Sequence, residues 1–105
     1  MRTVTIHDLK AALDGAAGDA TPLVLDVREP YEYAEGHVPG AELVPLATVP
    51  QRLDALPADQ PVYVVCAVGG RSAQAASFLS ARGVDAVNVD GGTQDWVAAG
   101  YPVQR

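Results

Sequence analysis

The stretch VYVVCAVGGRSAQAA, residues 62–76, joins two structural patterns in one short segment. Residues 62–66 form an apolar run rich in β-branched side chains, which is typical of a strand buried on both faces. Two glycines follow, and an alanine-rich helical pattern then runs from Arg71 to Arg82, before Gly83. Strands that alternate with helices are the mark of an α/β fold. The stretch therefore predicts a parallel sheet covered by helices.

The same alternation extends along the chain of 105 residues. Further apolar runs predict strands at residues 4–6, 23–27, 42–44 and 86–89. Helical patterns lie between or after the strands at residues 7–15, 47–57 and 93–102, with a short helical turn over residues 29–36. No repeat, low-complexity segment or linker interrupts them. We therefore expect one α/β domain over residues 1–105, with a mostly parallel sheet and helices on both faces.

Composition narrows the classes of partner and compartment. The net charge is −6 with seven basic residues, so there is no basic stripe for nucleic acid, and an anionic membrane is also disfavoured. No apolar stretch is long enough to cross a bilayer. The N-terminal residues MRTVTIHDLK lack the apolar core of a signal peptide. We therefore expect a cytoplasmic protein with no nucleic-acid or membrane partner.

Cys66 is the only cysteine, so the chain has no internal disulfide and too few thiols for a zinc cluster. His7 and His37 are far apart in the sequence, and neither has neighbours suited to bind a metal. We therefore predict neither a metal nor a cofactor. Cys66 is then either a small buried apolar residue or a reactive thiol.

The surroundings of Cys66 favour a reactive thiol. In a parallel sheet, ligands bind beyond the carboxyl ends of the strands, where Cys66 should lie. Two glycines allow main-chain N–H groups to converge, and the following helix adds its positive end. A free thiol is only about 3% ionised at pH 7, whereas such surroundings lower its pKa to roughly 3.5–7.5. Residues 66–71 thus predict a cradle for an anionic sulfur, either a persulfide or a tetrahedral oxyanion.

Other polar residues have structural interpretations. Asp26 and Arg28 end a predicted strand and should reach the same sheet edge as Cys66, as an ion pair that braces the loops. We interpret His37 as a hydrogen-bonding loop residue and Trp96 as part of the core. Ser72 fits the N-cap of the following helix. A solvated acidic face is expected from Glu29, Glu32 and Glu35.

Three ordered segments together resemble the signatures of the rhodanese family, specifically its single-domain sulfurtransferases. LVLDVREPYEYAEGHVPGA resembles the first signature, an Asp-x-Arg strand end followed by a Gly-His-x-Pro-Gly-Ala turn. VYVVCAVGGRSAQAA resembles the active-site segment, and VDGGTQDWVAAGYPV resembles the closing signature. The three segments run from Leu23 to Val103. The resemblance implies a five-stranded, mainly parallel sheet flanked by helices on both faces.

The resemblance also implies a reaction. The Cys66 thiolate would attack the outer sulfur of a donor such as thiosulfate, expel sulfite and keep the sulfur as a persulfide. A thiol, cyanide or a protein would then accept that sulfur. The residues implied to hold the donor and the persulfide are Ala67, Val68, Gly69, Gly70 and Arg71. The residues implied to support them are Asp26, Arg28, His37 and Ser72.

Two positions, 67 and 71, affect how tightly thiosulfate is expected to bind. Arg71 either contacts an anionic donor, which we favour, or ties the start of the helix to a carboxylate. Many relatives have an arginine directly after the cysteine, whereas this chain has Ala67. We therefore expect thiosulfate to react but to saturate poorly.

Three alternative functions fit parts of the sequence. A cysteine-arginine phosphatase or arsenate reductase has five residues between the two side chains, whereas four separate Cys66 from Arg71, and no aspartate is placed as a general acid. A thioredoxin-like oxidoreductase needs a second cysteine. A persulfide carrier or protein-binding rhodanese module has the same sequence features as the enzyme.

Overall fold

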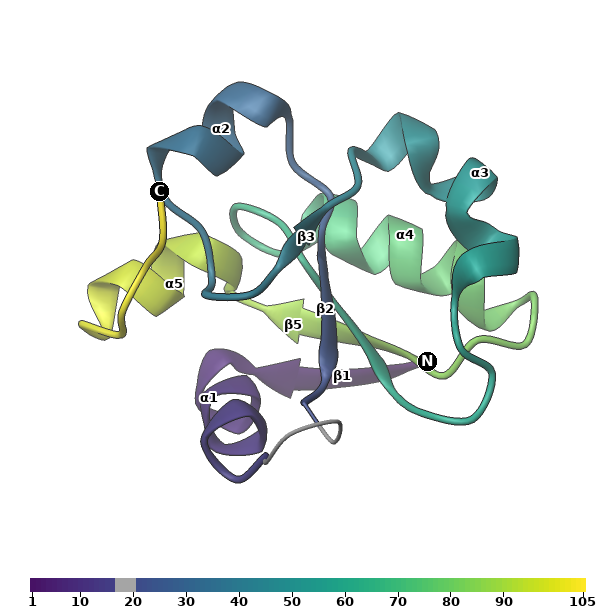
Figure 1. The fold of residues 1–105 in the computed structure, drawn as a ribbon, viewed down its shortest axis with the longest axis horizontal. Helices are drawn as coiled ribbons and strands as arrows, with labels where there is room; N and C mark the ends of the chain where they lie inside the picture. Colours follow the sequence, from purple (N-terminus) through teal and green to yellow (C-terminus); the bar gives the residue numbers. More distant parts are fainter. Residues whose placement is uncertain (17–20) are drawn as a thin grey trace.

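Five strands form one sheet in the computed structural model, which describes residues 1–16 and 21–105 (Figure 1). The strands are β1 (Arg2–Thr5), β2 (Leu23–Asp26), β3 (Glu42–Leu43), β4 (Val62–Val65) and β5 (Ala86–Asp90). Their order is β1-β5-β4-β2-β3, and every pairing is parallel. The predicted α/β class and the five-stranded sheet are confirmed. Residues 17–20 of the expected domain lie outside the described residues.

The helices follow the strands in the predicted order: α1 (Ile6–Asp14), α2 (Pro30–Glu35), α3 (Val49–Arg52), α4 (Gly70–Ser80) and α5 (Gly92–Ala98). The first strand ends earlier than predicted because Thr5 caps α1. The Thr5 side chain accepts a hydrogen bond from the Asp8 N–H, and the Asp8 carboxylate accepts one from the Thr5 N–H. Ile6 therefore begins the helix instead of ending the strand.

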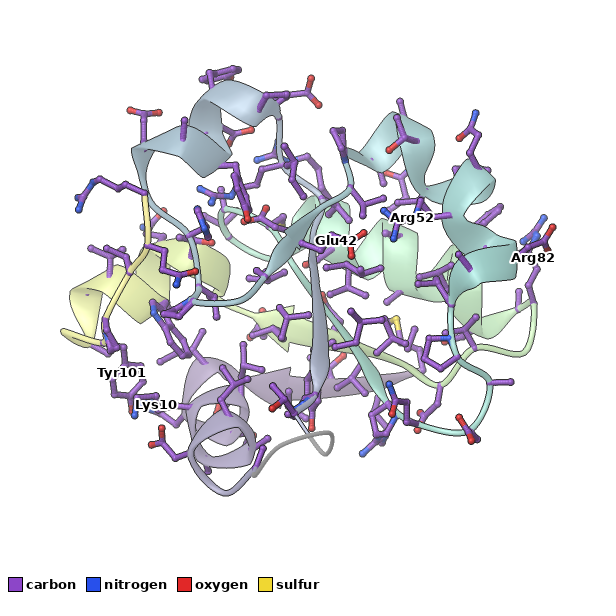
Figure 2. All side chains as sticks on the ribbon, in the orientation of Figure 1. Lys10, Glu42, Arg52, Arg82 and Tyr101 are labelled. Atoms are coloured by element: carbon purple, nitrogen blue, oxygen red, sulfur yellow. The ribbon has the colours of Figure 1, made fainter. Side chains whose placement is uncertain are left out.

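The predicted helix over residues 47–57 is broken into shorter pieces. Single 3₁₀ turns over Leu46–Thr48 and Leu53–Ala55 stand on either side of the four-residue α3. Positions 46 and 49, and likewise 53 and 56, are three residues apart, a spacing that lies on one side of both an α-helix and a 3₁₀ turn, so the pattern does not distinguish the two. Figure 2 shows Arg52 of α3 directed toward Glu42 of β3, with which it forms an ion pair.

Side chains alternate between two cores, one on each face of the sheet. One core packs Leu25, Val64 and Cys66 against Ala75 and Leu79 of α4. The other includes Val24, Val65 and Val89 from the strands, with Leu9 of α1 and Trp96 of α5. The continuous apolar runs of β2 and β4 follow from this burial on both faces.

The carboxyl ends of β2 and β4 lie side by side, since Asp26 is in register with Val65. In Figure 1, α2 lies next to the loop that joins β4 to α4, and the C-terminus lies near the end of α2. Arg105 donates a hydrogen bond of 2.9 Å to the Glu35 carbonyl there. This edge therefore brings the segment that follows Asp26 next to the Cys66 segment, as predicted. Among the described residues, no helix has the length and apolar composition needed to cross a membrane.

Candidate active site

Cys66 directly follows β4 and belongs to the face that packs against α4. Its alternation with Val62 and Val64 places it in the core cluster that contains Ala75 and Ala76. Only 1% of the residue is exposed. The cysteine is thus both a core residue and the first residue of the predicted cradle.

The sulfur atom nevertheless has polar partners. The Gly69 N–H donates a hydrogen bond of 3.0 Å to Sγ, and the Ser72 hydroxyl oxygen lies 3.4 Å from Sγ. The turn depends on Gly69, whose φ of 122° lies in the region that favours glycine. Gly70 lies in the first turn of α4 and is not among the glycines with positive φ. Only one of the two predicted glycines therefore supplies the unusual backbone conformation.

These contacts lower the pKa of the thiol. Burial raises the pKa of Cys66, but hydrogen bonds from the Ser72 hydroxyl and from the N–H groups of Ser72, Gly69 and Val68 lower it by more. The net shift is downward from the ordinary value. The physical cause is the one predicted, namely donors that favour the charged form.

Ser72 does not have the role that the sequence indicated. Gly69 is the N-cap of α4, and Ser72 is the third helical residue, with its side chain turned inward. Its hydroxyl lies 3.1 Å from the Gly69 carbonyl oxygen and 2.6 Å from Oδ1 of Asn88. The predicted N-cap is wrong because the conformation of Gly69 begins the helix earlier. Ser72 instead supports the sulfur.

Arg71 is held by a carboxylate of α2. Its Nη1 and Nη2 lie 2.7 and 2.9 Å from the two carboxylate oxygens of Glu32, in a bidentate pair. Glu32 also accepts a hydrogen bond of 3.0 Å from the Glu29 N–H. The pair lowers the pKa of Glu32 to about 2 and raises that of Arg71. In the structure, Arg71 therefore has the role that the sequence analysis favoured less: it ties the start of α4 to a carboxylate.

The expected solvated acidic face is only partly present. Glu29 and Glu35 are exposed, as expected. Glu32 is half-buried, and its interpretation as a solvated residue is wrong because Arg71 reaches it from α4. The two residues are 39 positions apart, so their contact depends on the packing of α2 beside the loop.

The structural ion pair predicted for Asp26 and Arg28 is confirmed. Nε of Arg28 lies 2.9 Å from Oδ1 of Asp26, and Nη2 lies 2.8 Å from Oδ2. Nη2 also donates a hydrogen bond of 2.9 Å to the Gly36 carbonyl. Asp26 is fully buried and Arg28 is 6% exposed. The pair fixes the segment that follows β2 onto the end of the sheet.

His37 and Trp96 also have their predicted structural roles. Nδ1 of His37 lies 2.8 Å from the Tyr33 carbonyl oxygen, and the His37 ring stacks on that of Tyr33. The main chain of His37 exchanges two hydrogen bonds with Gln104. Trp96 is 1% exposed and donates a hydrogen bond of 2.7 Å to the Pro102 carbonyl. Both residues therefore help to hold the loops around the site.

Sequence reasoning missed two residues that contact this site. Asn88 lies in β5, is 5% exposed and reaches Ser72. It is the only asparagine and the one polar residue in the apolar run of residues 86–89, which was the available signal. Gly92 begins α5 with a φ of 56°, and a Cβ built on it would lie 2.4 Å from the Cys66 carbonyl oxygen. The glycine pair at residues 91–92 fits this close approach but did not predict it.

Two surface cavities include residues of α2 or the residue before it in their lining. One of about 440 Å³ is lined by Ala67 of the loop together with Arg28, Glu32, Thr93, Gln94 and other residues. The second, of about 500 Å³, is lined by Glu29, Leu46 and Phe78 among others. The cavity beside Ala67 is the one adjoining the Cys66 loop. Within residues 1–16 and 21–105, no three His, Cys, Asp or Glu side chains are grouped so that they could hold a metal ion.

Comparison with known proteins identifies the family. The model of the rhodanese-like domain matches residues 5–99. A sulfurtransferase of Allochromatium vinosum is 37% identical over 82 residues, which cover 77% of each chain. The thiosulfate sulfurtransferase GlpE of Pseudoalteromonas translucida is 37% identical over 78 residues, covering 73% of this chain and 74% of that protein.

A solved structure agrees with the sequence comparisons. A crystal structure of a protein from Staphylococcus saprophyticus superimposes with a TM-score of 0.88, at 34% sequence identity and with 100% of both chains covered. The match includes the whole sheet and the segments at its carboxyl edge. By its sequence, its fold and the position of its cysteine loop, the chain belongs to the rhodanese-like domain family.

Proposed function

We propose that this protein transfers a sulfane sulfur from a donor to a thiophilic acceptor through a persulfide on Cys66. The observation that carries the proposal is the environment of Sγ. The sulfur stands at the carboxyl end of a parallel strand, and main-chain N–H groups and one hydroxyl lower the pKa of its thiol. Relatives named as sulfurtransferases support the same class of reaction.

The proposed reaction has two steps. The Cys66 thiolate attacks the outer sulfur of a thiosulfate-like anion, a new S–S bond forms, and the old S–S bond breaks with both electrons leaving on sulfite. The enzyme then carries a persulfide anion. An acceptor such as cyanide, a thiol or a protein thiolate attacks the terminal sulfur, and the Cys66 thiolate leaves. Thiocyanate forms when the acceptor is cyanide, and no external oxidant or reductant is needed.

The loop supplies donors for the negative charge that moves outward to the terminal sulfur. The first N–H groups of an α-helix have no acceptor within that helix, and α4 begins with Gly70 and Arg71. We assign the main chain of residues 67–71 to holding the donor and the persulfide. Such fixed dipoles stabilise a charge without any reorganisation of the site.

Thiosulfate should bind weakly. The guanidinium of Arg71 is paired in bidentate fashion with Glu32, and Ala67 provides no charge after the cysteine. A dianionic donor therefore meets no unpaired cation among the residues of the loop. We propose that thiosulfate is used with poor saturation, and that a thiol or a protein acceptor approaches through the cavity beside Ala67.

A panel of donors and acceptors tests the proposal. Thiocyanate formation from thiosulfate and cyanide should depend on the protein and should show a KM well above the micromolar range. A micromolar KM would contradict the role given to the Arg71–Glu32 pair. An aryl phosphate assayed alongside thiosulfate tests the phosphatase alternative. Phosphate release faster than sulfur transfer would overturn the proposed function.

A further inference from the structure

The Ser72 hydroxyl lies between the sulfur and a buried amide. Its oxygen is 3.4 Å from Sγ of Cys66 and 2.6 Å from Oδ1 of Asn88. Cys66 is 1% exposed, Ser72 fully buried and Asn88 5% exposed. Sequence alternation in β5 places Asn88 on the same face as Ala86, which packs in the α4 core. The side chains of Cys66, Ser72 and Asn88 are therefore linked by hydrogen bonds within an otherwise apolar core.

The direction of each hydrogen bond depends on the protonation state of the sulfur. A serine hydroxyl has one proton to donate and two lone pairs to accept with. With a neutral thiol, the S–H donates to the Ser72 oxygen. The Ser72 O–H then donates to Oδ1 of Asn88 at 2.6 Å, which is closer than its other acceptor, the Gly69 carbonyl oxygen at 3.1 Å. A thiolate has no proton to give and needs donors itself. The Ser72 O–H must then turn to the sulfur, which leaves Oδ1 of Asn88 without its donor.

An asparagine side chain can resolve this conflict. It carries a carbonyl oxygen and an NH₂ group at nearly equivalent positions, so half a turn of the amide replaces an acceptor by a donor. After that turn, Nδ2 donates to the Ser72 oxygen, and the Ser72 O–H is free for the sulfur. Neither a carboxylate nor an apolar side chain of the same shape can supply both arrangements.

We propose that Asn88 is a positioning residue for the Cys66 nucleophile, whose amide turns over as the sulfur ionises and so converts Ser72 from acceptor to donor. The inference rests on the proposed function because it concerns the same sulfur. The charged groups beside this hydrogen-bonded set of side chains include the carboxylate of Asp90, next to Gly69, and Arg71 with its partner Glu32. None of these is changed in the variants below.

The test measures how fast iodoacetamide alkylates Cys66 as a function of pH. The proteins are the wild type, Ser72→Ala, Asn88→Leu and the double variant. Leucine has nearly the shape of asparagine and lies among apolar neighbours, so the fold should be kept. Each single substitution should raise the midpoint of alkylation by about one pH unit, which is a roughly tenfold slower reaction at a pH below both midpoints.

The double variant distinguishes a relay from two independent effects. If Asn88 acts through Ser72, adding Asn88→Leu to Ser72→Ala should change the rate by less than about twofold. A roughly hundredfold combined loss, or an Asn88→Leu protein that titrates like the wild type, would overturn the proposal.

Asn88→Asp gives a second test that does not depend on the leucine variant. It keeps an acceptor and removes the N–H donor, but it also adds charge. The charge alone should raise the midpoint equally with and without Ser72. The proposal requires a larger rise with Ser72 present than in the S72A background, and equal rises would contradict it. Alkylation needs no sulfur donor, so this result is independent of whether sulfur transfer is detected.

Discussion

Segments 66–72 and 26–37 leave the same edge of the sheet from neighbouring strands but hold their polar groups differently. The first surrounds Cys66 with main-chain N–H groups and a hydroxyl, and it provides no carboxylate or amine in contact with the sulfur. The second pairs the carboxylate of Asp26 with the guanidinium of Arg28 and adds the Gly36 carbonyl. One segment can accept a negative charge at its centre, whereas the other already balances its own charges.

This difference indicates separate roles for the two segments. A centre made of dipoles can stabilise charge that appears during a reaction, and it does so without a fixed countercharge. A buried ion pair changes little during a reaction, but it is costly to break. Arg71 and Glu32 connect the two segments, because one belongs to α4 and the other to α2. Substitutions in the first segment should therefore affect chemistry, and substitutions in the second should affect stability.

Cys66→Ser should have the largest effect, and on activity alone. A serine hydroxyl is not ionised at neutral pH, so thiocyanate formation should fall by more than about 10³-fold. The melting temperature should stay within about 4 °C of the wild type, which corresponds to about 1 kcal/mol. Steady-state assays and thermal unfolding measure the two quantities. Normal activity in this variant would remove the assigned role of Cys66.

Asp26→Ala should act on stability. The substitution leaves the Arg28 guanidinium buried with the Gly36 carbonyl but without a countercharge, so the free energy of unfolding should fall by about 3–5 kcal/mol. Denaturant unfolding measures the loss, and activity per folded molecule provides the control. A large loss of activity at an unchanged melting temperature would instead place Asp26 in the active site.

Gly92→Ala should affect both stability and activity, because it disturbs the backbone of the Cys66 segment. The new Cβ would lie 2.4 Å from the Cys66 carbonyl oxygen and 2.7 Å from the Ala67 carbonyl carbon, so the loop must shift. We expect a loss of about 2–4 kcal/mol from backbone strain and overpacking together, with slower sulfur transfer. Unfolding and transfer assays measure both effects.

Gly83→Ala is the matched control for that substitution. Gly83 also has a positive φ, of 90°, but nothing lies within 4 Å of its added Cβ. Only the strain of about 1–2 kcal/mol should remain, and transfer by the folded protein should be unchanged. Equal losses of stability and activity in the two variants would refute the contact between Gly92 and the loop.

Glu32→Gln should have the smallest effect on stability and a specific pH dependence. The pair is partly exposed, so its loss should cost about 1 kcal/mol or less at pH 7. Because the pKa of Glu32 is lowered from 4.5 to about 2, its contribution is present above pH 4.5 and is lost as the pH falls toward 2. The difference in melting temperature between variant and wild type should therefore disappear near pH 2.

The same variant should improve the use of thiosulfate. Freeing Arg71 gives the donor a cation at the loop, so the KM for thiosulfate should fall several-fold while the KM for cyanide changes little. An unchanged thiosulfate KM, or a stability difference that persists at pH 2, would show that the Arg71–Glu32 pair does not have the assigned role.

The fold and the cysteine loop were predictable because they depend on local pattern and chain order. The apolar run of β4 and the helical pattern of α4 place Cys66 at the sheet edge without knowledge of any other contact. The Asp26–Arg28 pair was predictable for the same reason, since its members are two positions apart.

What could not be predicted depends on contacts between distant segments. The partner of Arg71 is 39 positions away, and that of Ser72 is 16 positions away. Choosing the carboxylate for Arg71 requires the position of α2, which no local pattern gives. The conformation of Gly69, likewise, decides that Ser72 turns inward and is not the cap. The helical spacing of residues 47–57 gave no warning of the two 3₁₀ turns.

The central claim is that Cys66 carries the transferred sulfur, and intact-mass spectrometry after exposure to thiosulfate tests it most directly. The wild-type protein should gain the mass of one sulfur atom, and cyanide should remove it with release of thiocyanate. Cys66→Ser should gain nothing under the same conditions. A sulfur adduct of equal amount on Cys66→Ser, or no adduct on the wild type with any sulfane donor, would contradict the account.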